Sequence, residues 1–116
     1  MYIIKNITYK NNNDVFVLNI SNNPTIKYNN ELYNIDYELV FKYIRSLYSI
    51  TEDWKEEYIN TTEIDGNSWE LIIEYSNDTE KVYSGKSSYP DNFDTFEELI
   101  YKTLNEVRYV WFKYWY

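Results

Sequence analysis

Two stretches of this chain repeat their apolar residues with helical spacing, and that periodicity constrains the fold more than any other feature. In residues 37–48 the apolar side chains recur three and four positions apart, which places them on one face of a helix. The stripe consists of Tyr37, Val40, Phe41, Ile44, Leu47 and Tyr48. It predicts an amphipathic helix over about residues 35–49, capped by Asn34 or Asp36, whose apolar face covers a sheet.

The C-terminal stretch has the same period and predicts a second helix. Its apolar stripe consists of Phe96, Leu99, Ile100, Leu104, Val107, Val110, Trp111 and Tyr114. Asp94, with Glu97 three residues later, predicts a capping box at the start of this helix.

Strand-like runs occupy much of the remaining chain and are separated by short turns rich in Asn. The predicted strands are residues 2–9, 15–21, 25–28, 69–75 and 81–84, and the first two and the last two form hairpins. Residues 51–58 predict a short helix or a continuation of the first one. The expected fold class is therefore α+β, a single domain over residues 1–116. Its antiparallel sheet has about five strands, with the two main helices packed on one face.

Composition excludes several kinds of chemistry. The chain has no Cys and no His, so it lacks thiolate nucleophiles, disulfides, zinc–thiolate sites and histidine bases. Residues 84–87 (SGKS) resemble the end of a phosphate-binding loop, but Glu80 stands where that motif needs its first glycine. We expect no enzyme activity, no cofactor and no catalytic or metal site. The chain shows neither a signal peptide nor a membrane-spanning run, which predicts a cytoplasmic protein.

Negative charge is concentrated in one region of the chain. Residues 51–100 hold fourteen carboxylates and three lysines, a net charge of −11, whereas the rest sums to +3 and the whole chain to −8. Such a region disfavours direct nucleic-acid binding, because it repels phosphate. It favours a basic partner protein, because complementary charges steer and speed association.

The candidate partner-binding residues lie in this acidic region. They are Glu52, Asp53, Trp54, Glu56, Glu57, Tyr58, Glu63, Asp65, Glu70 and Glu74. Trp54 stands among charged residues and is the better candidate for an exposed anchor, whereas Trp69 opens an alternating strand and is expected in the core. On a helix the first four carboxylates would align in pairs four residues apart. That alignment could hold a divalent cation, but it is also ordinary on solvated helices.

Part of the acidic region follows a distinct pattern of turn and aromatic residues. It reads D-G-x-x-W-x-L from Asp65, Y-x-G from Tyr83 and Y-P-x-N-F from Tyr89. The pattern resembles uncharacterised small acidic proteins of low-GC Gram-positive bacteria and their mobile elements. The resemblance covers residues 51–100 and implies no reaction or ligand. In physical terms the pattern describes a hairpin, a glycine turn and an extended entry into the last helix.

These features favour a small acidic protein-binding inhibitor or neutralising protein that blocks a basic, nucleic-acid-handling partner. A phage anti-defence protein of the anti-CRISPR type and a toxin-immunity protein are the two forms we expect. The fifteen tyrosines suit an interface, because Tyr is enriched at binding hot spots, although AT-rich codons also favour Tyr, Asn, Ile and Lys.

An alternative is a structural or regulatory homo-oligomer assembled through the aromatic C-terminal helix. Phe112, Trp115 and Tyr116 do not all share the face of the apolar stripe, so they are the candidate contact residues of a homodimer. In this alternative the acidic region serves solubility alone.

Overall fold

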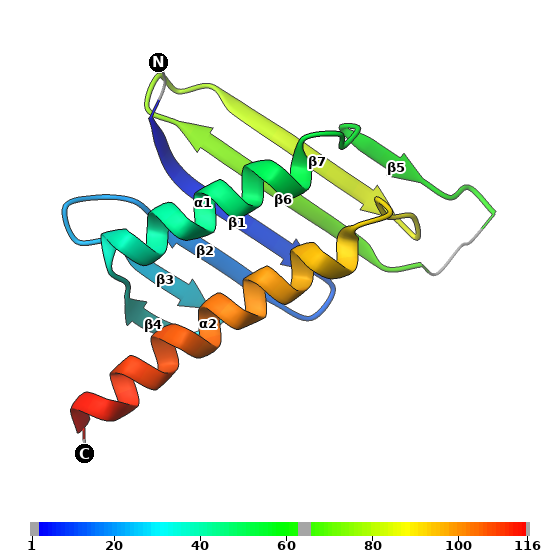
Figure 1. The fold of residues 1–116 in the computed structure, drawn as a ribbon. Helices are drawn as coiled ribbons and strands as arrows, with labels where there is room; N and C mark the ends of the chain where they lie inside the picture. Colours follow the sequence, from blue (N-terminus) through cyan, green and yellow to red (C-terminus); the bar gives the residue numbers. More distant parts are fainter. Residues whose placement is uncertain (1–2, 63–65, 116) are drawn as a thin grey trace.

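In the part of the chain that the computed structural model describes, residues 3–62 and 66–115 with side chains up to residue 109, two helices lie on one face of a seven-stranded sheet (Figure 1). The strands are β1 (Ile4–Asn11), β2 (Val15–Asn19), β3 (Thr25–Tyr28), β4 (Glu31–Asn34), β5 (Glu57–Ile59), β6 (Ser68–Tyr75) and β7 (Glu80–Lys86). The helices are α1 (Tyr37–Thr51) and α2 (Phe93–Trp115).

The sheet joins the two halves of the sequence along its centre. Its strand order is β4-β3-β2-β1-β6-β7-β5, so β1 from the N-terminal half pairs with β6 from the acidic half. Neighbouring strands are antiparallel except β5, which runs parallel to β7. The α+β class is thus confirmed, and both predicted hairpins are present. The expectation of about five strands, all antiparallel, was wrong.

The predicted helix over residues 51–58 was also wrong. Helix α1 ends at Thr51, whose Oγ1 donates a hydrogen bond to the Leu47 carbonyl oxygen over 3.0 Å. The chain then turns and hydrogen-bonds to the edge of β7, where the Ser84 amide donates to the Glu56 carbonyl over 2.9 Å. Charged residues gave this segment a helical composition, but the unpaired backbone groups along β7 offered it a better set of partners.

Helix α1 lies two residues later in the chain than predicted, and its buried face is rotated. The buried side chains are Val40, Tyr43, Leu47 and Thr51. Three members of the predicted stripe, Tyr37, Phe41 and Tyr48, are exposed. The apolar residues cover a wide arc of the helix, and contact with the sheet selects the part centred on Tyr43, whose ring lies 6.1 Å from that of Phe16. Asp36 occupies the N-cap position, but its side chain accepts no capping hydrogen bond.

Helix α2 has the predicted buried stripe but not the predicted cap. Phe96, Ile100, Leu104 and Val107 are buried as expected, whereas Leu99 is only half-buried. The side chains of Val110, Trp111 and Tyr114 lie outside the described set. The helix begins at Phe93, so Asp94 falls inside the first turn rather than before it. Glu97 therefore does not close a capping box, and one of its oxygens accepts a hydrogen bond from Tyr9 Oη over 2.9 Å.

Side chains alternate between the two faces of the sheet. On the helix-covered face, Ile7, Leu18 and Leu71 are completely buried. On the opposite face, Thr8 and Ile72 are half-buried and lie side by side on the paired central strands. The core therefore lies between the sheet and the helices, and the other face carries a mixed polar and apolar surface.

A carboxylate ties the β1–β2 turn to the neighbouring turn and to α2. Asp14 accepts hydrogen bonds from Asn29 Nδ2 at 3.1 Å and from Tyr101 Oη at 2.8 Å. Partial burial acts to raise the pKa of Asp14, but hydrogen bonds from Asn29, Tyr101 and Tyr28 outweigh it and lower that pKa below its usual value. Burial, together with the same bond to Asp14, raises the pKa of Tyr101 to about 12.

Candidate functional site

The aromatic residues of the acidic region gather at one end of the molecule, where α1 ends and α2 begins. Trp69 on β6 is buried, with its ring 4.8 Å from that of Phe93 and its Nε1 donating to the Ser88 carbonyl over 2.9 Å. Tyr89 packs against the same Phe93 ring, with centroids 4.9 Å apart and the ring planes tilted by 50°. We call this group of rings, completed by Trp54 and Tyr58, the aromatic end.

Gly85 lets the Trp69 indole reach its buried position. A β-carbon at residue 85 would lie 2.1 Å from Trp69 Nε1 and 2.5 Å from the Ser88 carbonyl oxygen. Atoms cannot approach this closely, so the strand and the indole can pack together only if position 85 has no side chain. The Y-x-G part of the sequence pattern thus has a packing reason.

Trp54 is held inside the aromatic end, so the prediction of a freely exposed anchor was wrong. The ring is half-buried and lies 5.3 Å from that of Phe96. Its Nε1 donates to Asn92 Oδ1 over 2.6 Å, and Asn92 Nδ2 in turn donates to the Ile50 carbonyl over 2.8 Å. Asn92 thereby fastens the end of α1 to the start of α2, and a Trp that satisfies its N–H in this way packs as part of the core.

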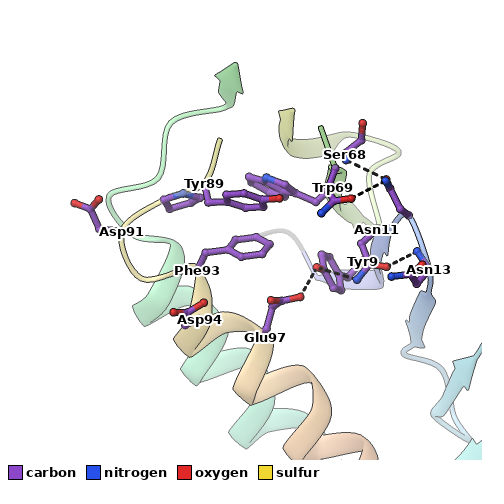
Figure 2. Close-up of a pocket in the computed structure, with 13 residues that line it drawn as sticks. Tyr9, Asn11, Asn13, Ser68, Trp69, Tyr89, Asp91, Phe93, Asp94 and Glu97 are labelled. Atoms are coloured by element: carbon purple, nitrogen blue, oxygen red, sulfur yellow. Dashed lines mark hydrogen bonds between the residues drawn. The ribbon is translucent and has the colours of Figure 1, made fainter. Parts of the chain in front are cut away.

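A cleft of about 420 Å³ opens beside the aromatic end (Figure 2). One wall is polar and comes from the β1–β2 turn and the start of β6: Asn11, Asn12, Asn13, Asn67 and Ser68. The other wall comes from the loop after β7 and the start of α2: Tyr89, Pro90, Asp91, Phe93, Asp94 and Glu97. Tyr9 and Trp69 lie between the two walls. The cleft therefore combines aromatic rings, side-chain amides and carboxylates.

A hydrogen-bonded chain crosses the cleft at Tyr9. Asn11 Nδ2 donates to Tyr9 Oη over 3.3 Å, and Tyr9 Oη donates to Glu97 Oε2 over 2.9 Å. Burial raises the pKa of Tyr9 well above its usual range, and the Glu97 charge adds to this effect while the bond from Asn11 opposes it. The phenol therefore stays protonated at neutral pH and holds the Glu97 carboxylate in place.

The amide wall is fixed by its own hydrogen bonds. Asn12 Nδ2 donates to Asn67 Oδ1 over 3.0 Å, and Asn12 Oδ1 accepts from the Ser68 amide over 3.0 Å. Asn11 Oδ1 accepts from the amides of Asn13 and Asp14 at 2.9 and 2.7 Å. The turn at 11–14 was predicted only as a hairpin connection. Nothing in its sequence indicated that its amides would line a cleft with residues from 67–97.

The structure separates the predicted partner-binding carboxylates into two groups. Glu52, Asp53 and Glu56 lie exposed on the segment that follows α1. Glu70 and Glu74 alternate with the buried residues of β6, so they project from the sheet face opposite the helices.

The remaining predicted residues also lie apart from one another. Glu57 projects from β5 on the same face as Glu70, whereas Tyr58 points inward and its ring lies 6.1 Å from that of Trp69. Its hydroxyl accepts a hydrogen bond from the Lys55 amide over 2.8 Å. Glu63 and Asp65 lie outside the described residues. The acidic region of the sequence is therefore not one surface in space.

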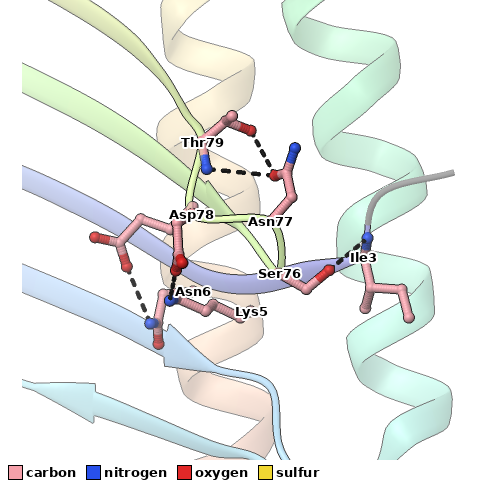
Figure 3. Close-up of polar contacts among 8 residues, drawn as sticks. Ile3, Lys5, Asn6, Ser76, Asn77, Asp78 and Thr79 are labelled. Carbon is pink, nitrogen blue, oxygen red and sulfur yellow. Dashed lines mark hydrogen bonds and ion pairs between the residues drawn. The ribbon is translucent and has the colours of Figure 1, made fainter.

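Figure 3 shows the end of the sheet at which Glu74 lies, whereas Glu70 pairs with Lys10 and Ser84 toward the other end of β6. Lys5 Nζ pairs with Asp78 at 3.2 Å, and Asn6 Nδ2 donates to Glu74 Oε2 over 3.0 Å. Asn77 accepts two bonds from Thr79 within the β6–β7 turn. These contacts give the carboxylates at this end of the sheet ordinary structural roles.

The divalent-cation alternative and the predicted oligomer contact depend on different parts of the chain. The alternative required a helix to align Glu52 with Glu56, and the chain beyond Thr51 is not helical. Among the described residues, no three acidic side chains gather closely enough to hold a metal ion.

The predicted dimer contacts are Phe112, Trp115 and Tyr116. Phe112 and Trp115 lie on α2, but their side chains are outside the described set, and Tyr116 lies outside the described residues altogether.

No helix in the described residues is long and apolar enough to cross a membrane.

Comparisons with protein-family models, curated proteins and solved structures gave no match to this chain. The resemblance drawn from the pattern in residues 65–93 therefore stays a prediction.

Proposed function

We propose that this protein binds a basic partner protein at its aromatic end and neutralises it. The observation that carries the proposal is the lack of countercharge. Of the twelve carboxylates in residues 51–100 that the structure describes, only Asp78 forms an ion pair with another described residue. The other charges are free to meet cations of a partner.

The carboxylates that follow α1 are poorly placed for folding stability, which supports a role in binding. Glu52 is the C-cap residue of α1, Asp53 follows it, and the last helical turn contains no basic residue. The C-terminus of a helix carries partial negative charge, so these two carboxylates cost the fold a few tenths of a kcal/mol or more. A cation of a basic partner, placed beside these carboxylates, would interact favourably with both of them and with the helix C-terminus.

Half-exposed rings next to these charges supply the apolar part of a contact. A second hollow of about 500 Å³ shares the loop that carries Tyr89 with the cleft. Its lining includes the carboxylates of Asp53 and Asp91, the ring of Tyr58 and one cation, Lys55. Tyr89 itself is 42% exposed. Tyr is enriched at binding hot spots because its ring buries apolar area, and nearby carboxylates help to orient a basic surface.

The proposed mechanism is competition for a basic groove. Enzymes that handle nucleic acids bind phosphates with Lys and Arg, and a dense set of carboxylates on a small rigid protein can occupy the same groove. The inhibitor would associate fast at low salt, and nucleic acid would compete with it. This is the behaviour of an anti-defence or immunity protein.

Capture from a bacterial lysate at low salt, followed by mass spectrometry, would provide the partner for the test. Affinity for the purified partner is then measured at low salt and at about 1 M salt, where charges act over only about 3 Å. We expect a steep loss of affinity with salt and displacement by nucleic acid. An affinity that does not change with salt would contradict the proposal.

Two matched variants locate the contact. One removes three charges after α1 (Glu52→Gln, Asp53→Asn, Glu56→Gln), and the other removes three from the opposite sheet face (Glu70→Gln, Glu74→Gln, Glu80→Gln). With about 0.5 kcal/mol per exposed pair, the first variant should bind about tenfold more weakly, and the second should bind as wild type does. Equal losses in both would indicate an effect of net charge alone.

A further inference from the structure

In the cleft of Figure 2, Glu97 is a carboxylate that a hydrogen bond holds on one oxygen and leaves open to a ligand on the other. Glu97 is half-buried, and its Oε2 accepts the bond from Tyr9 Oη, while its Oε1 has no hydrogen-bond partner among the described residues. The Tyr9 bond fixes the side chain from one direction only. A donor entering the cleft would find an ionised oxygen already oriented, which avoids the cost of ordering the side chain on binding.

Charge in the cleft has one sign. Asp91, Asp94 and Glu97 line it, and none of its described lining residues is Lys or Arg. Inside a cleft, where protein replaces part of the surrounding water, the field of these carboxylates is stronger than in open water. An anionic ligand is therefore excluded, and a cationic group is favoured.

The rings give the cleft a preference for a flat cation. Tyr89 is 42% exposed, and its ring packs against Phe93 with centroids 4.9 Å apart. A guanidinium group stacks on aromatic faces and is weakly hydrated, whereas an ammonium is a compact charge that holds its water more strongly. The opposite wall offers amide oxygens, including those of Asn13 and Asn67, to further N–H donors.

We propose that this cleft receives the guanidinium group of an arginine side chain that the basic partner inserts next to Tyr89 and Glu97. The proposal rests on the proposed function, because the arginine belongs to that partner. The volume of about 420 Å³ lies in the usual range of ligand pockets and accommodates a single long side chain. Glu97 Oε1 accepts an N–H bond of the guanidinium, and Tyr89 lies against the face of that group.

The cleft is tested with small probes on the whole protein. N-acetyl-arginine amide is titrated while the indole N–H resonances, that of Trp69 among them, are followed by NMR. N-acetyl-citrulline amide, which has the same shape without the charge, and N-acetyl-lysine amide serve as comparison probes. We expect saturable shifts of Trp69 with the arginine probe and at least tenfold weaker binding of the other two.

Two neighbouring carboxylates provide a matched pair of variants. Glu97→Gln removes the charge but keeps an oxygen that can accept the bond from Tyr9, whereas Glu98→Gln removes the same charge on the α1 side of α2. We expect Glu97→Gln to weaken the arginine probe about tenfold, Glu98→Gln to leave it unchanged, and Tyr89→Leu to weaken it severalfold. Thermal unfolding of each variant verifies that it is folded.

Several results would overturn the inference. These are equal shifts with citrulline, equal affinity for the lysine probe, equal loss in Glu97→Gln and Glu98→Gln, or shifts that avoid the cleft. The proposed function fails separately. If the partner binds Glu97→Gln normally, the cleft inference is wrong and the proposed function stands. If the arginine probe binds the cleft but partner affinity ignores salt, the proposed function is wrong and the cleft inference stands.

Discussion

The hydroxyl of Tyr43 is buried at the centre of the helix–sheet interface and has no hydrogen-bond partner among the described residues. Folding removes it from water without replacing the lost bonds, which costs about 1–3 kcal/mol. Tyr43→Phe keeps the ring and deletes the oxygen. The space left behind is small and costs only about 0.3 kcal/mol. We therefore expect the variant to be more stable by about 1–2 kcal/mol, a rise in Tm of about 4 °C per kcal/mol.

Tyr101→Phe provides the control of opposite sign. Its hydroxyl donates to Asp14 over 2.8 Å, so deleting it removes a bond to a charged group and should lower stability by about 1–2 kcal/mol. Urea and thermal unfolding followed by circular dichroism measure both variants. If Tyr43→Phe destabilises the protein as Tyr101→Phe does, the Tyr43 hydroxyl has a bonding partner, and the reasoning fails.

Alkaline pH gives an independent check on the same residue. Burial raises the pKa of Tyr43 above its ordinary value of 10.0, so the unfolded chain loses this proton first as pH rises. Below pH 10 this group does not change the stability of the wild type with pH, and above pH 10 its ionisation in the unfolded chain lowers that stability by about 1.4 kcal/mol per pH unit. Tyr43→Phe does not have this loss, so its advantage over wild type should widen between pH 9 and about pH 11. A constant difference would refute the assignment.

Four further changes test other contacts. Gly85→Ala should destabilise by about 1–3 kcal/mol or more, because the new methyl overlaps a buried indole; an unchanged Tm would show that the strand can shift. Asp14→Ala should lower the free energy of unfolding by about 1–3 kcal/mol at pH 7. The pKa of Asp14 in the folded protein lies below 3.8, so this loss should shrink as pH falls through that pKa. Unfolding measured along an acid titration tests this, and a loss that does not change with pH would contradict it. Ser87 has a φ of 52°, so Ser87→Gly should raise stability by up to about 1 kcal/mol in urea unfolding, and a clear loss would count against backbone strain. Glu52→Gln should raise the free energy of unfolding by a few tenths of a kcal/mol at low salt, seen as a slightly higher Tm, and a gain that persists at high salt would exclude the helix dipole as its cause.

The local elements of the fold were largely predictable from the sequence, because local spacing determines them. The period of α2 placed Phe96, Ile100 and Leu104 in the core, and alternation in β6 buried Trp69. Both hairpins followed from Asn-rich turns. Errors arose where a segment could satisfy its backbone in more than one way. The segment at Glu57 had a helical composition, but the free edge of β7 made it a strand.

The cleft shows a different limit of sequence reasoning. Its walls come from turns more than fifty residues apart, and Glu97 was interpreted as a helix cap because Asp94 precedes it by three residues. The helix begins one residue before Asp94, and the hydroxyl that Glu97 accepts from belongs to Tyr9, on the central strand β1. No local pattern reports such a partner.

The sequence by itself determined the α+β class, the location of the two helices and two hairpins, and the confinement of negative charge to residues 51–100, because periodicity, turn chemistry and charge are local properties. Only the tertiary structure decided which surfaces those charges share. Pairing β6 with β1 sends Glu70 and Glu74 to the sheet face opposite the helices, while the end of α1 leaves Glu52 and Asp53 near the aromatic end. Register and helix placement are set by contacts between distant residues, and through them one acidic region of sequence becomes two surfaces.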